Sequence, residues 1–347
     1  MELDISLLER LSNAIAPSGY EGEVVGIIRE ELADMVDEIH IDEFGNVLAF
    51  LKGSDPRILL DAHTDEVSFL ITHIEGNGVL RFYTLGSIDP RVAYGQRVVL
   101  KGEKGLVRGF IGAKAPHLLK KEELQKVPDY SELFIDIGAE SKEEALSMGI
   151  KPGTVGTFDS KFVRLTENRI MGKAFDDRVG VFVIISVLKM LKDSDVNVVA
   201  AFSTQEEVGL RGARLTAWKS DAKYGLALEC TAASDVPGTP EHLYSTSLGK
   251  GPAITIADRS VIAHPKIVRL LIETAEENDI PYQFKSVVAG GTDAGVISLT
   301  KGGIPSGVVS VPARYIHGPA AIADLRDIEN TISLVYHFVK KISKEKI

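Results

Sequence analysis

Apolar residues recur at helical spacing at both ends of the chain. Residues 5–15 and 24–35 place apolar side chains three and four positions apart, which predicts two amphipathic helices. Ser18 and Glu21 stand three residues apart ahead of the second helix, and this spacing predicts a capping box at its start. The same periodicity over residues 324–342 predicts a long amphipathic helix at the end of the chain.

Between residues 67 and 163 the pattern changes to short β-type runs separated by glycines. Closely spaced strands with glycine turns are typical of a small barrel or sandwich. Two polar stretches in this region have helical character. The strands are expected at 67–74, 79–82, 96–100, 106–111 and 133–137, and the helices at 120–126 and 142–148.

Elsewhere, apolar strands alternate with helical patterns. This alternation predicts an α/β domain in which helices sandwich a mixed sheet. We assign residues 1–66 and 165–347 to that domain and residues 67–164 to an inserted, small β-rich domain. The predicted elements are a hairpin at 39–51, strands at 58–60, 196–202, 224–228 and within 303–311, and helices at 177–191 and 267–275.

Composition narrows the chemistry. The 347 residues include 39 Lys and Arg against 49 Asp and Glu, a formal net charge of −10, which argues against nucleic acid or an anionic membrane as a partner. The single cysteine excludes an intramolecular disulfide, a structural thiolate zinc site and an iron–sulfur cluster. Any metal must therefore be held by imidazole and carboxylate groups.

The start of the chain is acidic where a signal peptide would be basic, and no apolar run reaches the roughly 18 residues that a membrane span needs. We therefore predict a cytoplasmic protein whose partners are small molecules, peptides or copies of itself.

Acidic residues and histidines come directly after the predicted strands, or shortly before a helix. Ligands of α/β sheets bind beyond the carboxyl ends of the strands, so these side chains are expected at one edge. The candidates are His63, Asp65, Asp176, Glu206, Glu207, Glu229 and His317.

Each candidate alone has an ordinary explanation as a surface histidine, a helix cap or a solvated acid. Together they have the composition of a site for two divalent cations. Imidazole suits zinc and cobalt, and a carboxylate can bridge cations held ~3.5–4 Å apart. Asp65, two residues after His63, is placed to bind the far nitrogen of that ring and fix its tautomer.

Five segments, in order along the chain, resemble motifs of the TET-type (tetrahedral) aminopeptidases. This family of co-catalytic zinc exopeptidases includes glutamyl and deblocking aminopeptidases. The matching segments are residues 61–66, 173–178, 206–212, 290–295 and 314–317.

The resemblance implies that Asp176 bridges two metals, that His63 and Glu229 complete one site, and that Glu207 and His317 complete the other. Glu206 would be the general base and Asp65 the orienter of His63. Family members often carry aspartate at the position of Glu229, so the geometry there is open.

The same resemblance implies a quaternary structure. Residues 67–164 would form a PDZ-like dimerisation domain, and the dimers would assemble into a hollow tetrahedral homododecamer.

The predicted function is hydrolysis of N-terminal residues from short peptides by a metal-bridged hydroxide, with Glu206 carrying the proton to the leaving amine. Alternatives that keep the metals are an N-acyl amino acid deacylase and a carboxypeptidase. A glycosidase (endoglucanase-like) would use Glu206 and Glu207 as its carboxylate pair, and a peptide-binding scaffold would need no metal.

Other residues receive simpler assignments. Cys230 is expected to be a buried packing residue, Gly290 and Gly291 a tight loop near the site, and Asp293 a further contact. The sequence leaves the substrate preference open. A cation in the pocket would favour acidic side chains, with Arg211, Arg259, Lys285 and Arg314 as candidates, and a hydrophobic pocket fits the sequence equally well.

Overall fold

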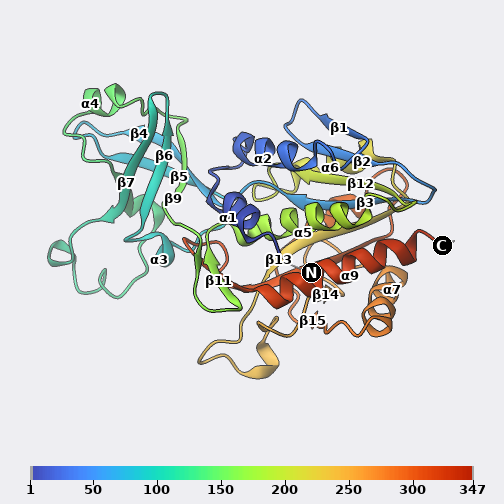
Figure 1. Ribbon diagram of the computed structural model, residues 1–347. Coiled ribbons are helices and arrows are strands. Elements are labelled where there is room, and N and C mark those ends of the chain that lie inside the picture. Colours follow the sequence, from blue (N-terminus) through green and yellow to red (C-terminus); the bar gives the residue numbers. More distant parts are fainter. Residues whose placement is uncertain (1–2, 346–347) are drawn as a thin grey trace.

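The protein is seen in a computed structural model that describes residues 3–345, so the first two and last two residues of the predicted larger domain lie outside it. A large mixed sheet covered by helices lies at the right of Figure 1, and a closed barrel lies at the left. Within the described chain, no helix is both long enough and apolar enough to cross a membrane.

The large sheet has eleven strands. They are β1 (Glu38–Ile41), β2 (Val47–Leu51), β3 (Arg57–His63), β10 (Val163–Arg164), β11 (Arg169–Gly172), β12 (Asn197–Ser203), β13 (Tyr224–Ala232), β14 (Ala253–Thr255), β15 (Gln283–Lys285), β16 (Ser306–Arg314) and β17 (Ala321–Asp324). The main order is β1-β2-β12-β3-β13-β16-β17-β11-β10, with β14 and β15 beside β16.

The four central strands β12, β3, β13 and β16 are parallel. Ser203 pairs with His63, and Glu229 pairs with Ser310, so these strands finish at the same edge of the sheet. The predicted hairpin at 39–51 is confirmed as the antiparallel pair β1 and β2.

Helices cover both faces of this sheet, as the sequence predicts. The helices are α1 (Ile5–Asn13), α2 (Gly22–Leu32), α5 (Phe175–Leu191), α6 (Arg211–Ser220), α7 (Pro265–Glu277), α8 (Ala294–Ser298) and α9 (Leu325–Ile342). Ile58 and Leu60 pack in the core beneath α1, α2, α5, α7 and α9, while Leu59 packs with α6 and α8. Successive strand residues point to opposite faces, which explains why β3 is apolar without alternation.

The barrel closes in the order β4-β5-β8-β7-β6-β9 and has a separate hydrophobic core. Phe69 packs edge-to-face on Phe82 and Phe158, with ring centroids 5.4 and 5.1 Å apart. The strands are β4 (Ser68–Ile74), β5 (Leu80–Leu85), β6 (Arg97–Gly102), β7 (Gly105–Ala113), β8 (Leu133–Asp136) and β9 (Val155–Phe158). The short helices are α3 (Pro90–Ala93), α4 (Lys142–Ser147), η1 (Pro116–Leu118) and η2 (Tyr130–Glu132), and η3 (Glu241–Leu243) lies outside the barrel.

The predicted helix at 120–126 is wrong, because that stretch forms turns. All seven of its residues are exposed, and a short polar segment without a buried face lacks the packing that stabilises most protein helices. The helix predicted at 142–148 is confirmed as α4.

The predicted capping box at Ser18 and Glu21 is also wrong. Helix α2 begins at Gly22 without a side-chain cap. The Ser18 hydroxyl instead donates to Asp65 Oδ2 at 2.6 Å, and Glu21 Oε1 accepts from the amides of Gly19 and Gln205. Both side chains have partners outside the helix.

Glu66 links the barrel, the sheet and the N-terminal segment. Its carboxylate accepts hydrogen bonds from Lys173 Nζ at 2.8 Å, from Thr157 Oγ1 of β9 at 2.8 Å and from the Ala16 amide at 3.0 Å. The buried Arg178 guanidinium lies 3.5 Å away. Burial alone would raise the pKa of Glu66, but the two cations lower it, whereas burial lowers the pKa of Lys173 to about 8.

We expect Lys173→Met to lower the free energy of unfolding by about 3 kcal/mol, because it leaves a buried carboxylate short of its closest cation. Urea denaturation at fixed protein concentration measures the change. Lys192→Met, at an exposed position, is the matched control and should be near neutral. Equal stability of both variants would show that Arg178 alone compensates Glu66.

Candidate metal centre

All seven predicted site residues gather at the carboxyl edge of the central parallel strands. His63 is the last residue of β3, Glu206 and Glu207 lie in the loop after β12, and His317 follows β16. Glu229 lies inside β13, which continues beyond the predicted end at residue 228. The parallel register therefore brings together side chains that are far apart in the sequence.

Asp176 stands between the two imidazoles. Its Oδ1 lies 3.3 Å from His63 Nε2, and its Oδ2 lies 3.2 Å from His317 Nε2. It belongs to the first turn of α5, where its backbone is non-helical and the carboxylate turns into the site. One oxygen toward each imidazole is the arrangement in which a carboxylate can bridge two cations.

The far nitrogen of each imidazole also faces an acceptor. His63 Nδ1 lies 3.4 Å from Asp65 Oδ1, and His317 Nδ1 lies 2.9 Å from the carbonyl oxygen of Ser87. A proton held on Nδ1 leaves the Nε2 lone pair free for a metal. Ser87 follows barrel strand β5, and its role could not be found from sequence because a main-chain carbonyl carries no residue-type signal.

The ligand atoms form three overlapping groups, each within 4.8 Å: His63, Asp177 and Glu229; His63, Glu206 and Glu207; and Asp176, Glu207 and His317. Asp177 was absent from the predicted ligands, although its position beside Asp176 is a signal that could have found it. A Cβ at Gly180 would come within 2.3 Å of Asp177 Oδ2, so glycine there makes room for the carboxylate.

The site holds more negative charge than its imidazoles can balance. Burial raises the pKa of Glu206 to about 8 and that of Glu207 to about 7. Burial likewise raises the pKa values of Asp177 and Glu229. These shifts mean that the fully ionised cluster is costly without further positive charge.

The pKa values of both imidazoles are also raised, which for a histidine favours the charged form. Burial would lower the pKa of both, but neighbouring acids outweigh it: the carboxylates of Asp176 and Asp65 raise the pKa of His63, and Glu207 and Asp176 raise that of His317 to about 10. Burial would raise the pKa of Asp176, yet the two imidazoles hold it well below its usual range.

The donor set fits divalent cations. Glu207 Oε1 and Asp177 Oδ2 are buried without a hydrogen-bond partner. Both residues are among the potential ligands, Glu207 in two of the groups and Asp177 in one. Carboxylate and imidazole ligands suit zinc, cobalt and related ions, which would supply the missing positive charge.

A cavity of about 560 Å³ opens onto this centre. Lys285 lines it, whereas Arg314 is paired with Asp235, Arg211 lines a neighbouring cavity and Arg259 is exposed. Gly290 and Gly291 line the same cavity, as expected of a loop near the site.

Two further residues adjoin Glu229. The Asp293 amide donates to Glu229 Oε1 at 3.0 Å, so this neighbour contacts a predicted ligand. Cys230 is buried, and burial raises the pKa of its thiol, which agrees with a packing role.

Comparison with known proteins identifies the family. The family model for the M42 glutamyl aminopeptidase matches residues 45–334. The chain belongs to this family. This chain is 33% identical over 344 residues to the lysyl aminopeptidase of Pyrococcus furiosus, and the match covers 98% of both proteins.

Solved structures agree. A TET aminopeptidase from a marine-sediment Thaumarchaeota archaeon superimposes with a TM-score of 0.96 at 40% identity, over 98% of this chain and 96% of that one. The TET1 peptidase of Pyrococcus horikoshii gives 0.87 at 36% identity, over 96% and 98%. The resemblance to TET-type aminopeptidases is confirmed, and the chain is a metal-dependent aminopeptidase with the TET fold.

We expect Asp176→Asn to lose bound metal, because it removes charge from the carboxylate that faces both imidazoles. Inductively coupled plasma mass spectrometry after dialysis measures the content, with about two ions expected per wild-type chain. Asp34→Asn, at an exposed position after α2, should keep the wild-type value. Wild-type metal content in Asp176→Asn would rule out its role as a ligand.

Proposed function

We propose that this M42 aminopeptidase removes N-terminal residues from short peptides with two divalent cations, zinc or cobalt. His63, Asp176, Glu207, Glu229 and His317 would hold them. The observation that carries this proposal is Asp176, whose two oxygens each face a different imidazole. We also propose a cytoplasmic location, on the sequence features described above.

When bound, the cations would polarise the scissile carbonyl and lower the pKa of a water molecule. The protein's own contribution is proton transfer. Glu206 lies at the cavity with Oε2 3.9 Å from His63 Nε2, and its side chain is only 13% exposed. A carboxylate there can take a proton from the attacking water and give it to the leaving amine, while Asp65 keeps His63 oriented.

The alternatives leave part of this arrangement unexplained. A glycosidase acting through Glu206 and Glu207 gives no role to two histidines that both face Asp176. A scaffold has no use for a buried surplus of carboxylates. A deacylase or carboxypeptidase keeps the metals but does not need a free amino terminus, so substrates can separate it from an aminopeptidase.

Glu206→Gln should retain metal and lower kcat by about 10²–10⁴-fold, the usual contribution of general acid–base catalysis. Aminoacyl p-nitroanilides assayed with zinc or cobalt measure turnover, and Glu43→Gln, an exposed acid, is the control. Wild-type turnover in Glu206→Gln would exclude the general-base role. Equal cleavage of N-acetylated substrates would instead favour a deacylase.

We further propose that the cavity prefers an acidic N-terminal side chain. Lys285 is the member of the four candidate cations that lines the cavity, and among residues 3–345 no carboxylate lies within ion-pairing distance of it. Leu243, Val287 and Ile316 supply apolar walls, so an aliphatic stem ending in a carboxylate fits.

Lys285→Met should lower kcat/KM for glutamyl substrates about 10- to 100-fold relative to leucyl substrates, since a hydrogen bond to a charged group contributes roughly 1.5–3 kcal/mol. Arg259→Met, at an exposed position outside the cavity lining, is the matched control. An unchanged glutamyl-to-leucyl ratio would remove Lys285 from the specificity pocket.

We also propose that residues 67–164 form a PDZ-like dimerisation domain within a tetrahedral homododecamer. The P. horikoshii TET1 peptidase can assemble into a tetrahedron or a large octahedral shell. On this chain the barrel exposes Tyr83, Leu106 and Phe110 on β5 and β7, and such apolar surface is typical of an interface.

Phe110→Asp should therefore reduce the oligomer to smaller species, because it puts a charge on the proposed contact. Light scattering during gel filtration gives the mass. Ile262→Asp, an equally drastic change at an exposed residue outside the barrel, should leave the barrel-mediated dimer intact. Dimers that persist in Phe110→Asp would move the dimer contact elsewhere.

A further inference from the structure

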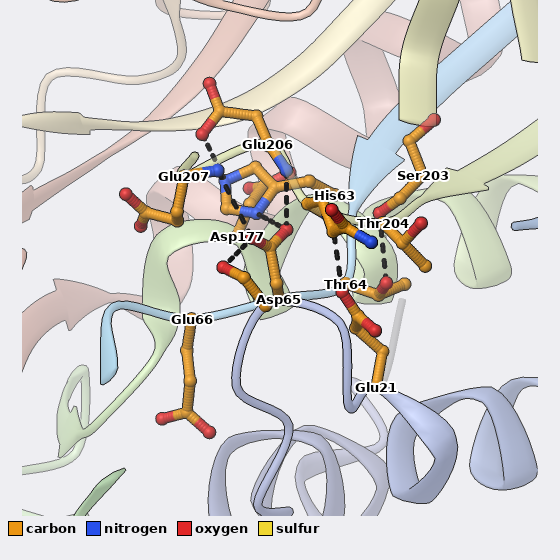
Figure 2. A network of polar contacts seen from close by, with 12 residues as sticks. Glu21, His63, Thr64, Asp65, Glu66, Asp177, Ser203, Thr204, Glu206 and Glu207 are labelled. Atoms are coloured by element: carbon orange, nitrogen blue, oxygen red, sulfur yellow. Dashed lines mark hydrogen bonds and ion pairs between the residues drawn. The ribbon is translucent and has the colours of Figure 1, made fainter. Parts of the chain in front are cut away.

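The loop that carries Glu206 and Glu207 is held by two carboxylates through three successive amides. The Gln205 amide donates to Glu21 Oε1 at 3.2 Å, that of Glu206 to Asp65 Oδ1 at 2.9 Å, and that of Glu207 to Asp65 Oδ2 at 3.2 Å. Figure 2 shows dashed lines running from the Asp65 carboxylate to His63 and to the loop of the two glutamates, with Glu21 on the far side of Thr64.

These carboxylates are fixed in turn by the N-terminal turn, residues 17–21. The Ser18 hydroxyl donates to Asp65 Oδ2 at 2.6 Å, and the Gly19 amide donates to Glu21 Oε1 at 2.7 Å. Pro17 pairs with Glu66 as an isolated bridge. Ser18 and Glu21 are both buried, so solvent competes little for these bonds.

The loop depends on such external bonds. Gln205 has φ 57° and Leu210 has φ 56°, left-handed conformations that cost a non-glycine residue about 1–3 kcal/mol and persist only where the surroundings enforce them. Residues 204–210 lie beyond the end of β12, outside its ladder. The hydrogen bonds from these backbone amides to Asp65 and Glu21 therefore help to fix the backbone positions of Glu206 and Glu207.

We propose that Ser18 and Glu21 are positioning residues that hold Glu206 in its place for proton transfer. This rests on the proposed role of Glu206. Asp65 then serves two groups at once, because its Oδ1 lies near His63 Nδ1 and also accepts from the Glu206 amide. The N-terminal turn fixes Asp65, and through it the distance between the general base and the first imidazole.

The test uses the metal-loaded enzyme. In Glu21→Met, kcat should fall about 10- to 100-fold with KM within about threefold, because displacement of a catalytic group by about 1 Å has effects of this size. Glu21→Gln should restore kcat, since its amide oxygen can still accept from Gly19 and Gln205. Glu9→Met, an exposed acid on α1, should match the wild type.

Hydrogen exchange gives a second readout that needs no substrate. Amides of residues 204–208 should exchange faster in Glu21→Met and in Ser18→Ala than in the wild type or Glu9→Met, with and without metal. Ser18→Ala deletes one hydroxyl and provides the same comparison if Glu21→Met does not fold.

Unchanged exchange at residues 204–208, a rise in KM at constant kcat, or failure of Glu21→Gln to restore turnover would each overturn the positioning role. A wild-type enzyme that cleaves no aminoacyl substrate with zinc or cobalt would overturn the proposed function instead. The exchange comparison still decides whether the N-terminal turn holds the loop.

Discussion

Buried negative charge is the constraint on which this molecule depends. Six carboxyl groups, from Asp65, Asp176, Asp177, Glu206, Glu207 and Glu229, surround two imidazoles at the edge of the parallel strands. Burial disfavours the ionised form of each acid and repulsion from neighbouring acids adds to it, so the pKa values of Asp177, Glu206, Glu207 and Glu229 are raised. Such a cluster is stable in its ionised form only when cations join it.

The rest of the fold serves to keep these groups at close range. Parallel β12, β3, β13 and β16 bring their ends to one edge, and helices packed on both faces bury the body of these strands. Glu66 follows Asp65 directly, but Figure 2 shows its side chain turned away from the cluster. There it pairs with the buried cations Lys173 and Arg178, so the charge of Glu66 is balanced separately from that of the cluster.

The seven site residues could be predicted because each has a local signal, an acid or histidine near the end of an apolar run or the start of a helix. The mixed sheet between two layers of helices could be predicted because its apolar strands alternate along the chain with segments of helical periodicity. Ser87 could not be predicted, because it acts through a main-chain carbonyl. Ser18 and Glu21 were assigned to a helix cap that local spacing allows, whereas distant partners on the folded sheet bind them instead. Helices α6 and α8 were missed because their short buried faces give a weak pattern.

The two imidazoles differ in the acceptor that faces their Nδ1 atoms. Asp65, which faces Nδ1 of His63, belongs to the same segment as His63 and is fixed by the N-terminal turn, whereas Ser87, which faces Nδ1 of His317, lies in the connection between barrel strands β5 and β6. The centre is therefore mechanically asymmetric. A small rotation of the barrel against the sheet would move the acceptor of His317 directly, whereas the acceptor of His63 is also held by the N-terminal turn.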